Sequence, residues 1–168
     1  EKHEMTYDAA NERFSYDLTD ITTGDYCYYY TVDGEEKLDA YNAETKDYDG
    51  KTCSYRFYKK FDAAITAELS QSSMDYNDNN VLTIKTNPAE GADMSGFEVA
   101  TATVDLSALG LSSTYAIDPE LMEATISCLD TTTTGDKTLP VTVKDIYGNV
   151  YRTSTNVAVT ERDKKDGD

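Results

Sequence analysis

Apolar and polar residues alternate along most of the first third of the chain. The run 26–32 has a period of two, which places Tyr26, Tyr28, Tyr30 and Val32 on one face and leaves Tyr29 on the other. Further strands are predicted over residues 13–20 and 51–58, and the turn dipeptides Asp33-Gly34 and Asp49-Gly50 separate the runs. We expect the row that begins at Tyr26 to pack inward.

Beyond residue 63 the strands become rich in Thr, Val and Ala. Strands are predicted over 65–69, 81–86, 99–106, 124–129, 138–143 and 150–159. Asp118-Pro119 predicts a single helical turn, and no helical pattern of ten or more residues occurs. Short strands joined by Gly, Asn and Asp turns are typical of an antiparallel β-sandwich, so we predict an all-β protein.

The change in composition near residues 61–65 marks a boundary between two units. We predict two immunoglobulin-like antiparallel β-sandwiches in tandem, over residues 1–62 and 63–162, followed by a charged tail at 163–168. The second unit has the usual size of such a sandwich, about 100 residues. The first has three or four visible strands, so we expect a truncated unit rather than one that leans on its neighbour.

Charge excludes several classes of partner. The 168 residues include 15 Lys and Arg against 32 Asp and Glu, which gives a formal net charge of −17. Phosphate backbones and anionic lipids would repel such a chain, so we expect neither a nucleic-acid nor a membrane partner. No run has the length of a membrane helix, and no signal peptide is visible.

Few residues are suited to acid–base or metal chemistry. His3 is the one histidine and lies beside the chain end, which disfavours triad-type catalysis and His-based metal sites. Cys27, Cys53 and Cys128 show no CxxC spacing, and we expect them to pack as thiols. A bridge between Cys27 and Cys53 stays open, since it depends on whether their strands are neighbours.

Two stretches resemble accessory modules of bacterial α-glucan enzymes. Residues 23–34, TGDYCYYYTVDG, and residues 38–42, LDAYN, resemble the early-set immunoglobulin-like modules that precede the catalytic barrel in pullulanases, amylopullulanases and amylases of the α-amylase superfamily. The family pattern has Phe where this chain has Tyr30, and Pro where it has Ala40. The second unit is similar to the immunoglobulin-like domain before that barrel, at residues 79–82, 104–110, 117–122 and 137–149.

This resemblance implies a secreted or surface-attached accessory region without a catalytic domain of its own. Its expected partners are an α-glucan such as starch or maltooligosaccharide and the adjacent catalytic domain, toward which the tail 163–168 leads. Sugar rings stack on exposed aromatic rings while polar side chains bind the hydroxyls. The candidate binding residues are Tyr29, Tyr41, Asn42, Tyr48 and Tyr58, with Tyr55 as an alternative to Tyr58 if the other face of its strand is exposed.

Two alternatives remain beside glucan binding. A structural spacer or protein-interaction module without carbohydrate affinity needs only a stable sandwich. A structural calcium ion is a weaker alternative, because Asp75, Asn77 and Asn79 alternate like the first ligands of an EF-hand loop, although the later positions do not fit. A looser site that joins this loop to Asp145 and Asn149 is also considered. We otherwise expect no metal and no cofactor.

Overall fold

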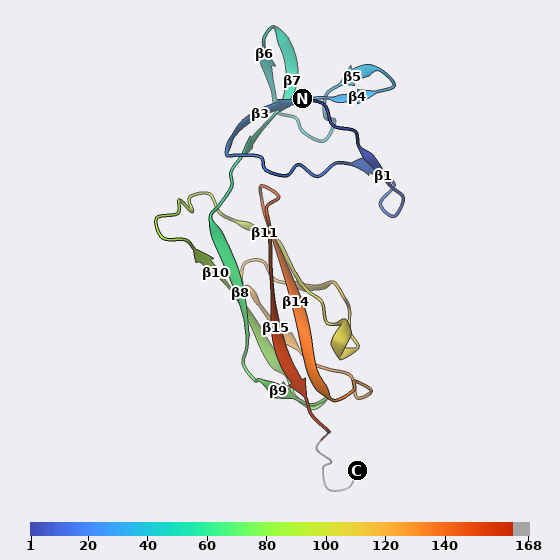
Figure 1. The fold of residues 1–168 in the computed structure, drawn as a ribbon, viewed down its shortest axis with the longest axis vertical. Coiled ribbons are helices and arrows are strands. Elements are labelled where there is room, and N and C mark those ends of the chain that lie inside the picture. Colours follow the sequence, from blue (N-terminus) through green and yellow to red (C-terminus); the bar gives the residue numbers. More distant parts are fainter. Residues whose placement is uncertain (163–168) are drawn as a thin grey trace. The chain divides into compact units, whose positions relative to one another are not determined.

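The computed structural model describes residues 1–162, and the tail predicted at 163–168 lies outside the described residues. Over the described residues the chain is all-β, as predicted, with one short 3-10 helix, η1 (Ser107–Leu109). It divides into two units, Glu1–Lys60 and Phe61–Asp168, each with its own set of sheets. Figure 1 shows the strands of both units as arrows.

The strands of the second unit form two sheets. Their bounds are β8 (Ala63–Leu69), β9 (Ser73–Met74), β10 (Asn80–Pro88), β11 (Val99–Val104), β12 (Tyr115–Ile117), β13 (Glu123–Ile126), β14 (Gly135–Asp145) and β15 (Val150–Val159). One sheet has the order β13-β10-β8 and the other β12-β11-β14-β15-β9. The pairing is antiparallel except that β9 runs parallel to β15. This arrangement is compatible with an immunoglobulin-like sandwich.

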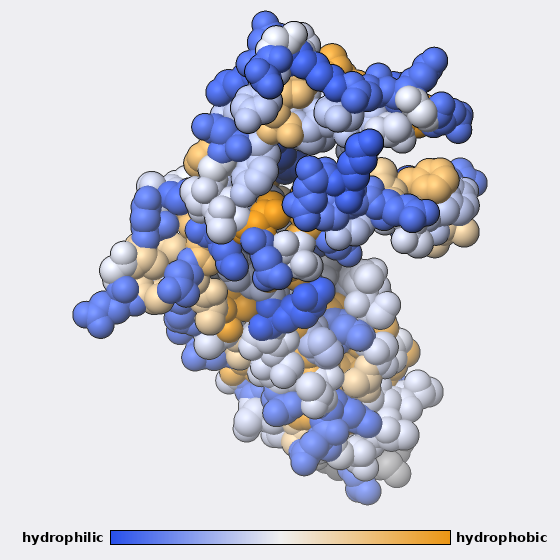
Figure 2. Space-filling view, turned by 45° about the horizontal axis from the view of Figure 1, so that its top comes forward, coloured by the Kyte–Doolittle hydropathy of each residue, from blue (hydrophilic) through white to orange (hydrophobic). Residues whose placement is uncertain are grey.

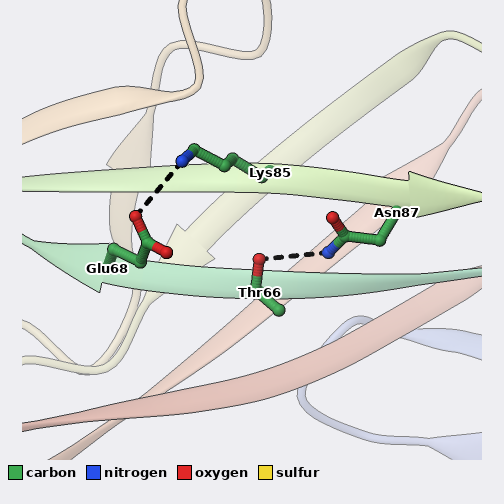
Figure 3. Close-up of polar contacts among 4 residues, drawn as sticks. All are labelled: Thr66, Glu68, Lys85 and Asn87. Carbon is green, nitrogen blue, oxygen red and sulfur yellow. Dashed lines mark hydrogen bonds and ion pairs between the residues drawn. The ribbon is translucent and has the colours of Figure 1, made fainter.

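The core of the second unit follows from the alternation of its strands. Every second residue of β14 is buried from Leu139 to Asp145, and the other sheet contributes residues such as Leu82 and Ile84. The outward face of β8 and β10 is polar. There Lys85 forms an ion pair with Glu68 at 3.2 Å, and the Asn87 amide donates to the Thr66 hydroxyl at 3.1 Å (Figure 3).

Two local features of the second unit differ from a regular strand pattern. Strict alternation along the predicted strand 99–106 would place Ala100 on the inner face with Ala102, but the register of β11 and β14 shifts between Val99 and Thr101, and Ala100 is exposed. The alternation is interrupted because a bulge adds one residue at this point. The turn predicted after Asp118 forms as a single turn, closed by the Met122 N–H donating to the Asp118 carbonyl at 2.8 Å.

A buried carboxylate closes the hairpin between β14 and β15. Asp145 is 2% exposed and accepts hydrogen bonds from the Asn149 side-chain amide at 2.8 Å and the Tyr151 hydroxyl at 2.8 Å. It also accepts from the backbone N–H groups of Tyr147 at 2.9 Å and Asn149 at 3.0 Å. Four donors therefore compensate the cost of burying this charge.

The first unit contains three small antiparallel sheets. Its strands are β1 (Thr6–Asp8), β2 (Arg13–Ser15), β3 (Gly24–Tyr28), β4 (Tyr30–Val32), β5 (Glu35–Lys37), β6 (Thr45–Tyr48) and β7 (Lys51–Tyr58). They pair as β1-β2, β3-β7-β6 and β4-β5. Within Glu1–Lys60 only Cys53 and Ser54 are buried. Apolar burial therefore contributes little to this unit.

The predicted strand over residues 26–32 is wrong as a continuous element. The chain leaves the β3-β7-β6 sheet at Tyr29, and β4 then pairs with β5 across the Asp33-Gly34 turn. Tyr26 and Tyr28 are half-buried, whereas Val32 is exposed, so the expected inward row ends at the break. The strand predicted over 13–20 likewise ends at Ser15.

Figure 2 shows a surface that is mostly hydrophilic, with apolar side chains in smaller separate areas. Such a surface agrees with the net charge of −17. Among residues 1–162 there is no helix with the length and hydrophobicity needed to cross a bilayer.

We expect Asp145→Ala to destabilise the second unit by about 3 kcal/mol, because the substitution leaves several buried donors without an acceptor. Urea titrations followed through the methyl NMR signals of Leu139 and Val141 measure this as a lower midpoint with an unchanged slope. Asp93→Ala is the matched control. Asp93 accepts from the Ser95 N–H at 2.9 Å in an exposed turn, so we expect a loss below about 1 kcal/mol. Equal losses in both variants would contradict this account of Asp145.

Candidate functional site

The register of the β3-β7-β6 sheet assigns its side chains to two faces. Residues directly opposite each other on neighbouring strands share a face, and successive residues alternate. Tyr28 and Thr45 both lie opposite Ser54 and therefore share one face with it. Tyr48 lies opposite Lys51 on the other face. We call this second face the tyrosine–lysine face; it carries Lys46, Tyr48, Lys51 and Tyr55, with Tyr29 against it.

Two lysines lie over tyrosine rings on the tyrosine–lysine face. The Lys51 Nζ is 3.8 Å from the centre of the Tyr29 ring, and the Lys46 Nζ is 3.9 Å from the centre of the Tyr55 ring. These are cation–π contacts, in which the ammonium group meets the negative face of the ring. Lys51 also forms an ion pair with Glu36 of β5. One lysine thus connects an aromatic ring with a carboxylate.

Tyr29 and Tyr48 are both neighbours of Lys51. Tyr29 is 38% exposed and contacts the Lys51 ammonium, while Tyr48 is 71% exposed and lies opposite Lys51 across the Asp49-Gly50 turn. Lys51 therefore contacts both the Tyr29 ring and the Glu36 carboxylate, and Tyr48 is its cross-strand neighbour. This group offers apolar ring faces, ammonium donors and carboxylate acceptors within one small area.

The Tyr55 hydroxyl is held at the edge of the same face. It donates a hydrogen bond to the Asp25 carboxylate. This hydrogen bond, with smaller contributions from burial and from the negative charge of Asp25, raises the pKa of Tyr55 above its ordinary value. The carboxylates of Asp25 and Glu36 thus both have partners within the sheet region, Tyr55 and Lys51 respectively.

A hydrogen-bonded network occupies the opposite face of the sheet. The Tyr28 hydroxyl donates to the Asp39 carboxylate at 2.8 Å and accepts from the Asn42 amide at 3.0 Å. The Asp39 N–H donates to the Ser54 hydroxyl at 2.8 Å, and the Asn42 amide also donates to the Tyr55 carbonyl at 2.8 Å. Burial, followed by the hydrogen bond to Asp39, raises the pKa of Tyr28, although the Asn42 contact opposes this shift.

This network fixes the loop that carries Tyr41. Asp39 and Asn42 are anchored to the sheet, and the Asp39 carboxylate also accepts from the Tyr41 N–H at 2.9 Å. The Tyr41 side chain is fully exposed, at 102% of its reference area. A loop tied at both ends therefore presents a single aromatic ring to solvent.

The structure divides the five predicted binding residues into separate groups. Tyr29 and Tyr48 share the tyrosine–lysine face, and Tyr41 lies on its own loop. Tyr58 lies on the other side of the sheet, where its ring packs edge-to-face on Tyr26 with 6.5 Å between centroids. The Asn42 amide donates to Tyr28 and the Tyr55 carbonyl, so it serves the loop rather than an open surface.

Sequence reasoning did not identify Lys51 and Glu36. A signal for Lys51 was present, since a two-residue turn at Asp49-Gly50 sets Tyr48 opposite Lys51. No comparable signal existed for Glu36, because its contact depends on how β5 lies against the other sheet. Tyr55 and Tyr58 both belong to β7. Of these two alternatives, Tyr55 lies on the tyrosine–lysine face, where Lys46 contacts its ring.

The loop considered for calcium is held by its own hydrogen bonds. The Asp75 carboxylate accepts from the Asn77 N–H at 2.7 Å, and the Asp78 carboxylate accepts from the Asp75 N–H at 2.9 Å. The looser site is wrong: β9 and this loop adjoin the end of β15, whereas Asp145 and Asn149 precede its start. Within residues 1–162 no three His, Cys, Asp or Glu side chains form a metal-binding group.

Two concavities lie apart from the candidate residues. One in the first unit is lined by residues that include Tyr16, Leu18 and Tyr26. The other, in the second unit, is lined by residues that include Cys128 and Arg162. Neither is lined by Tyr29, Tyr41 or Tyr48, whose side chains are exposed.

No known protein-family model matches this chain, and no curated protein sequence matches it.

We expect Tyr28→Phe to destabilise the first unit by about 1 kcal/mol at neutral pH, because the ring stays while two hydrogen bonds are lost. The Tyr28 hydroxyl stabilises the fold in its protonated form, in which it donates to Asp39. Its pKa is raised in the folded state, so the stabilisation decreases as pH rises. The difference in the free energy of unfolding between wild type and Tyr28→Phe is fully present below the ordinary tyrosine pKa of about 10. It is lost as pH rises through the folded-state pKa.

Urea unfolding at a series of pH values, followed through the methyl signals of Ile21 and Val32, measures this difference. Comparing wild type with the variant at each pH removes the contributions of groups that the two proteins share. A difference that grows above pH of about 10 would contradict the assigned role of the hydroxyl.

Proposed function

We propose that this chain is a non-catalytic accessory region of an extracellular enzyme that degrades α-glucans such as starch or pullulan, and that its first unit binds the glucan. The observation that carries the proposal is the tyrosine–lysine face, where Lys51 contacts Tyr29 and Glu36 and has Tyr48 as its cross-strand neighbour. The resemblance of residues 23–34 and 38–42 to accessory modules of such enzymes supports the same function.

The chemistry of this face suits a sugar chain. Pyranose rings have apolar C–H faces, which stack on the exposed ring of Tyr48, and hydroxyl groups, which bind the Lys51 ammonium and the Glu36 carboxylate. Tyr41 offers a second ring, held by a separate loop, for a longer glucan. An open face with several weak contacts suits a polymer, because neighbouring sugar units bind together.

The carboxylates on this face favour binding over catalysis. A general acid in glycoside hydrolysis needs a raised pKa, and the partner carboxylate must lie across a cleft. Asp25 and Glu36 are instead held by Tyr55 and Lys51 on an exposed sheet. The proposed region therefore acts by holding substrate near a catalytic domain elsewhere in the enzyme.

A spacer is the second candidate function, and the topology of the second unit favours it. β8 begins this unit, and β9 follows β8 by four residues and pairs in parallel with the end of β15. β15 therefore ends where β8 ends, so the chain enters the sandwich at one end and leaves it at the other. A strand of ten residues spans about 30 Å, which is the separation such a unit would impose.

Calorimetric titration with maltoheptaose tests glucan binding directly. We expect Tyr48→Ala and Tyr29→Ala each to weaken binding by about tenfold or more, since truncation of an aromatic contact at the centre of a site commonly costs over 1.4 kcal/mol. Tyr41→Ala should weaken binding in the same direction.

Tyr115→Ala is the matched control, because Tyr115 lies in β12 of the second unit with an exposure close to that of Tyr29. Its affinity should equal that of the unmodified chain. Absence of heat with the unmodified chain would refute glucan binding and leave the spacer function. Equal loss in the Tyr115 variant would remove the assignment to the tyrosine–lysine face.

A further inference from the structure

Cys27 and Cys53 lie on neighbouring strands and on the same face of one sheet. Cys27 of β3 lies opposite Tyr55 of β7, and Cys53 is two residues from Tyr55 along β7. Because side chains two residues apart on a strand point to the same side, the two cysteines are diagonal neighbours across the strand pair. The condition that the sequence left open, adjacency of the two strands, is therefore met.

The two thiols have different access to solvent. Cys27 is exposed, whereas Cys53 is 4% exposed and its thiol donates to the Lys46 carbonyl at 3.4 Å. Burial, with a smaller contribution from the neighbouring Cys27 thiol, raises the pKa of Cys53.

We propose that Cys27 and Cys53 form an oxidation site, at which a small disulfide such as oxidised glutathione converts the two thiols into a bridge between β3 and β7. This inference is independent of glucan binding. It follows from the register of the strands, which places the two thiols on one face of adjacent strands.

The chemistry proceeds in two exchange steps. The exposed Cys27, as thiolate, attacks one sulfur of oxidised glutathione, forms a mixed disulfide and releases one glutathione thiolate. Cys53, once deprotonated, attacks the Cys27 sulfur, forms the Cys27–Cys53 bond and releases the second glutathione. The protein loses two protons and two electrons, and the glutathione disulfide is reduced to two thiols. Cys27 reacts first because a soluble oxidant reaches the exposed sulfur.

Such a bridge fits the composition of the first unit. Only Cys53 and Ser54 are buried within Glu1–Lys60, so this unit lacks the apolar core that stabilises a sandwich. Small domains of this kind commonly depend on covalent cross-links. The bridge would close the segment 27–53, which contains Tyr29, Tyr41 and Tyr48, and so reduce its freedom in the unfolded state.

The third cysteine is a poor partner for either thiol. Cys128 is buried in the core of the second unit, among its apolar residues. Burial, with smaller contributions from Asp75 and Asp78, raises its pKa, so it reacts slowly with oxidants. One bridge and one remaining thiol are therefore expected.

The test uses the full folded chain, first reduced and then incubated with oxidised glutathione near pH 8. We expect the thiol count after denaturation to fall from three to one. Trypsin should then release the peptide 14–37 covalently linked to the peptide 52–56, since cleavage follows Arg13, Lys37, Lys51 and Arg56. In the oxidised chain, amide exchange at Tyr55 should slow on the order of 100-fold, from closure of a loop of about 25 residues.

Cys27→Ser is the matched control, because it replaces an exposed thiol and leaves Cys53 and the fold in place. It should retain two thiols after the same treatment, and its Tyr55 exchange should not slow. Three free thiols in the treated wild type would overturn the proposal, as would glutathione retained on Cys27 or a Cys27-linked dimer of two chains. A bridge that leaves exchange at Tyr55 unchanged would overturn its stabilising role.

Discussion

The hydrogen bond from the Tyr28 hydroxyl to the Asp39 carboxylate is the interaction on which the first unit depends. Cys53 and Ser54 are its only buried residues, so its loops are fixed mainly by polar contacts. Asn42 completes the network by donating to the same hydroxyl, and Asp39 in turn positions the Tyr41 backbone. A hydrogen bond of this kind contributes about 1 kcal/mol, and several of them together decide whether the segment is ordered.

The second unit is stabilised by a different force. Its two sheets enclose side chains such as Leu82, Leu139 and Val143, which are removed from water on both sides. The one buried charge of its hairpin, Asp145, is compensated by four donors rather than by a cation. One chain thus contains a unit held by apolar burial and a unit held by polar contacts. The residues proposed to bind glucan lie in the first unit, which is held by polar contacts.

Alternation in the sequence predicted six of the eight strands described in the second unit, because strands such as β14 bury every second residue over much of their length and leave a clear period of two. The short strands β9 and β12 were missed. The pattern also misled in the first unit. It failed at Tyr29, since the pattern continues through a residue at which the chain passes to another sheet. β5 was missed because Glu35–Lys37 has no apolar residue. The tyrosines of the site were identified from their type and position, but their grouping with Lys51 and Glu36 required the three-dimensional register.

Backbone order in the loop of residues 39–42 tests the account of the first unit most directly. If the Tyr28–Asp39 network fixes this loop, the NMR order parameter of Tyr41 should be close to that of rigid backbone, about 0.85, as in the strand β7. A value below about 0.6 at Tyr41, with β7 rigid, would show that the fully exposed ring belongs to a flexible loop. That result would contradict the claim that polar contacts hold the candidate site in place.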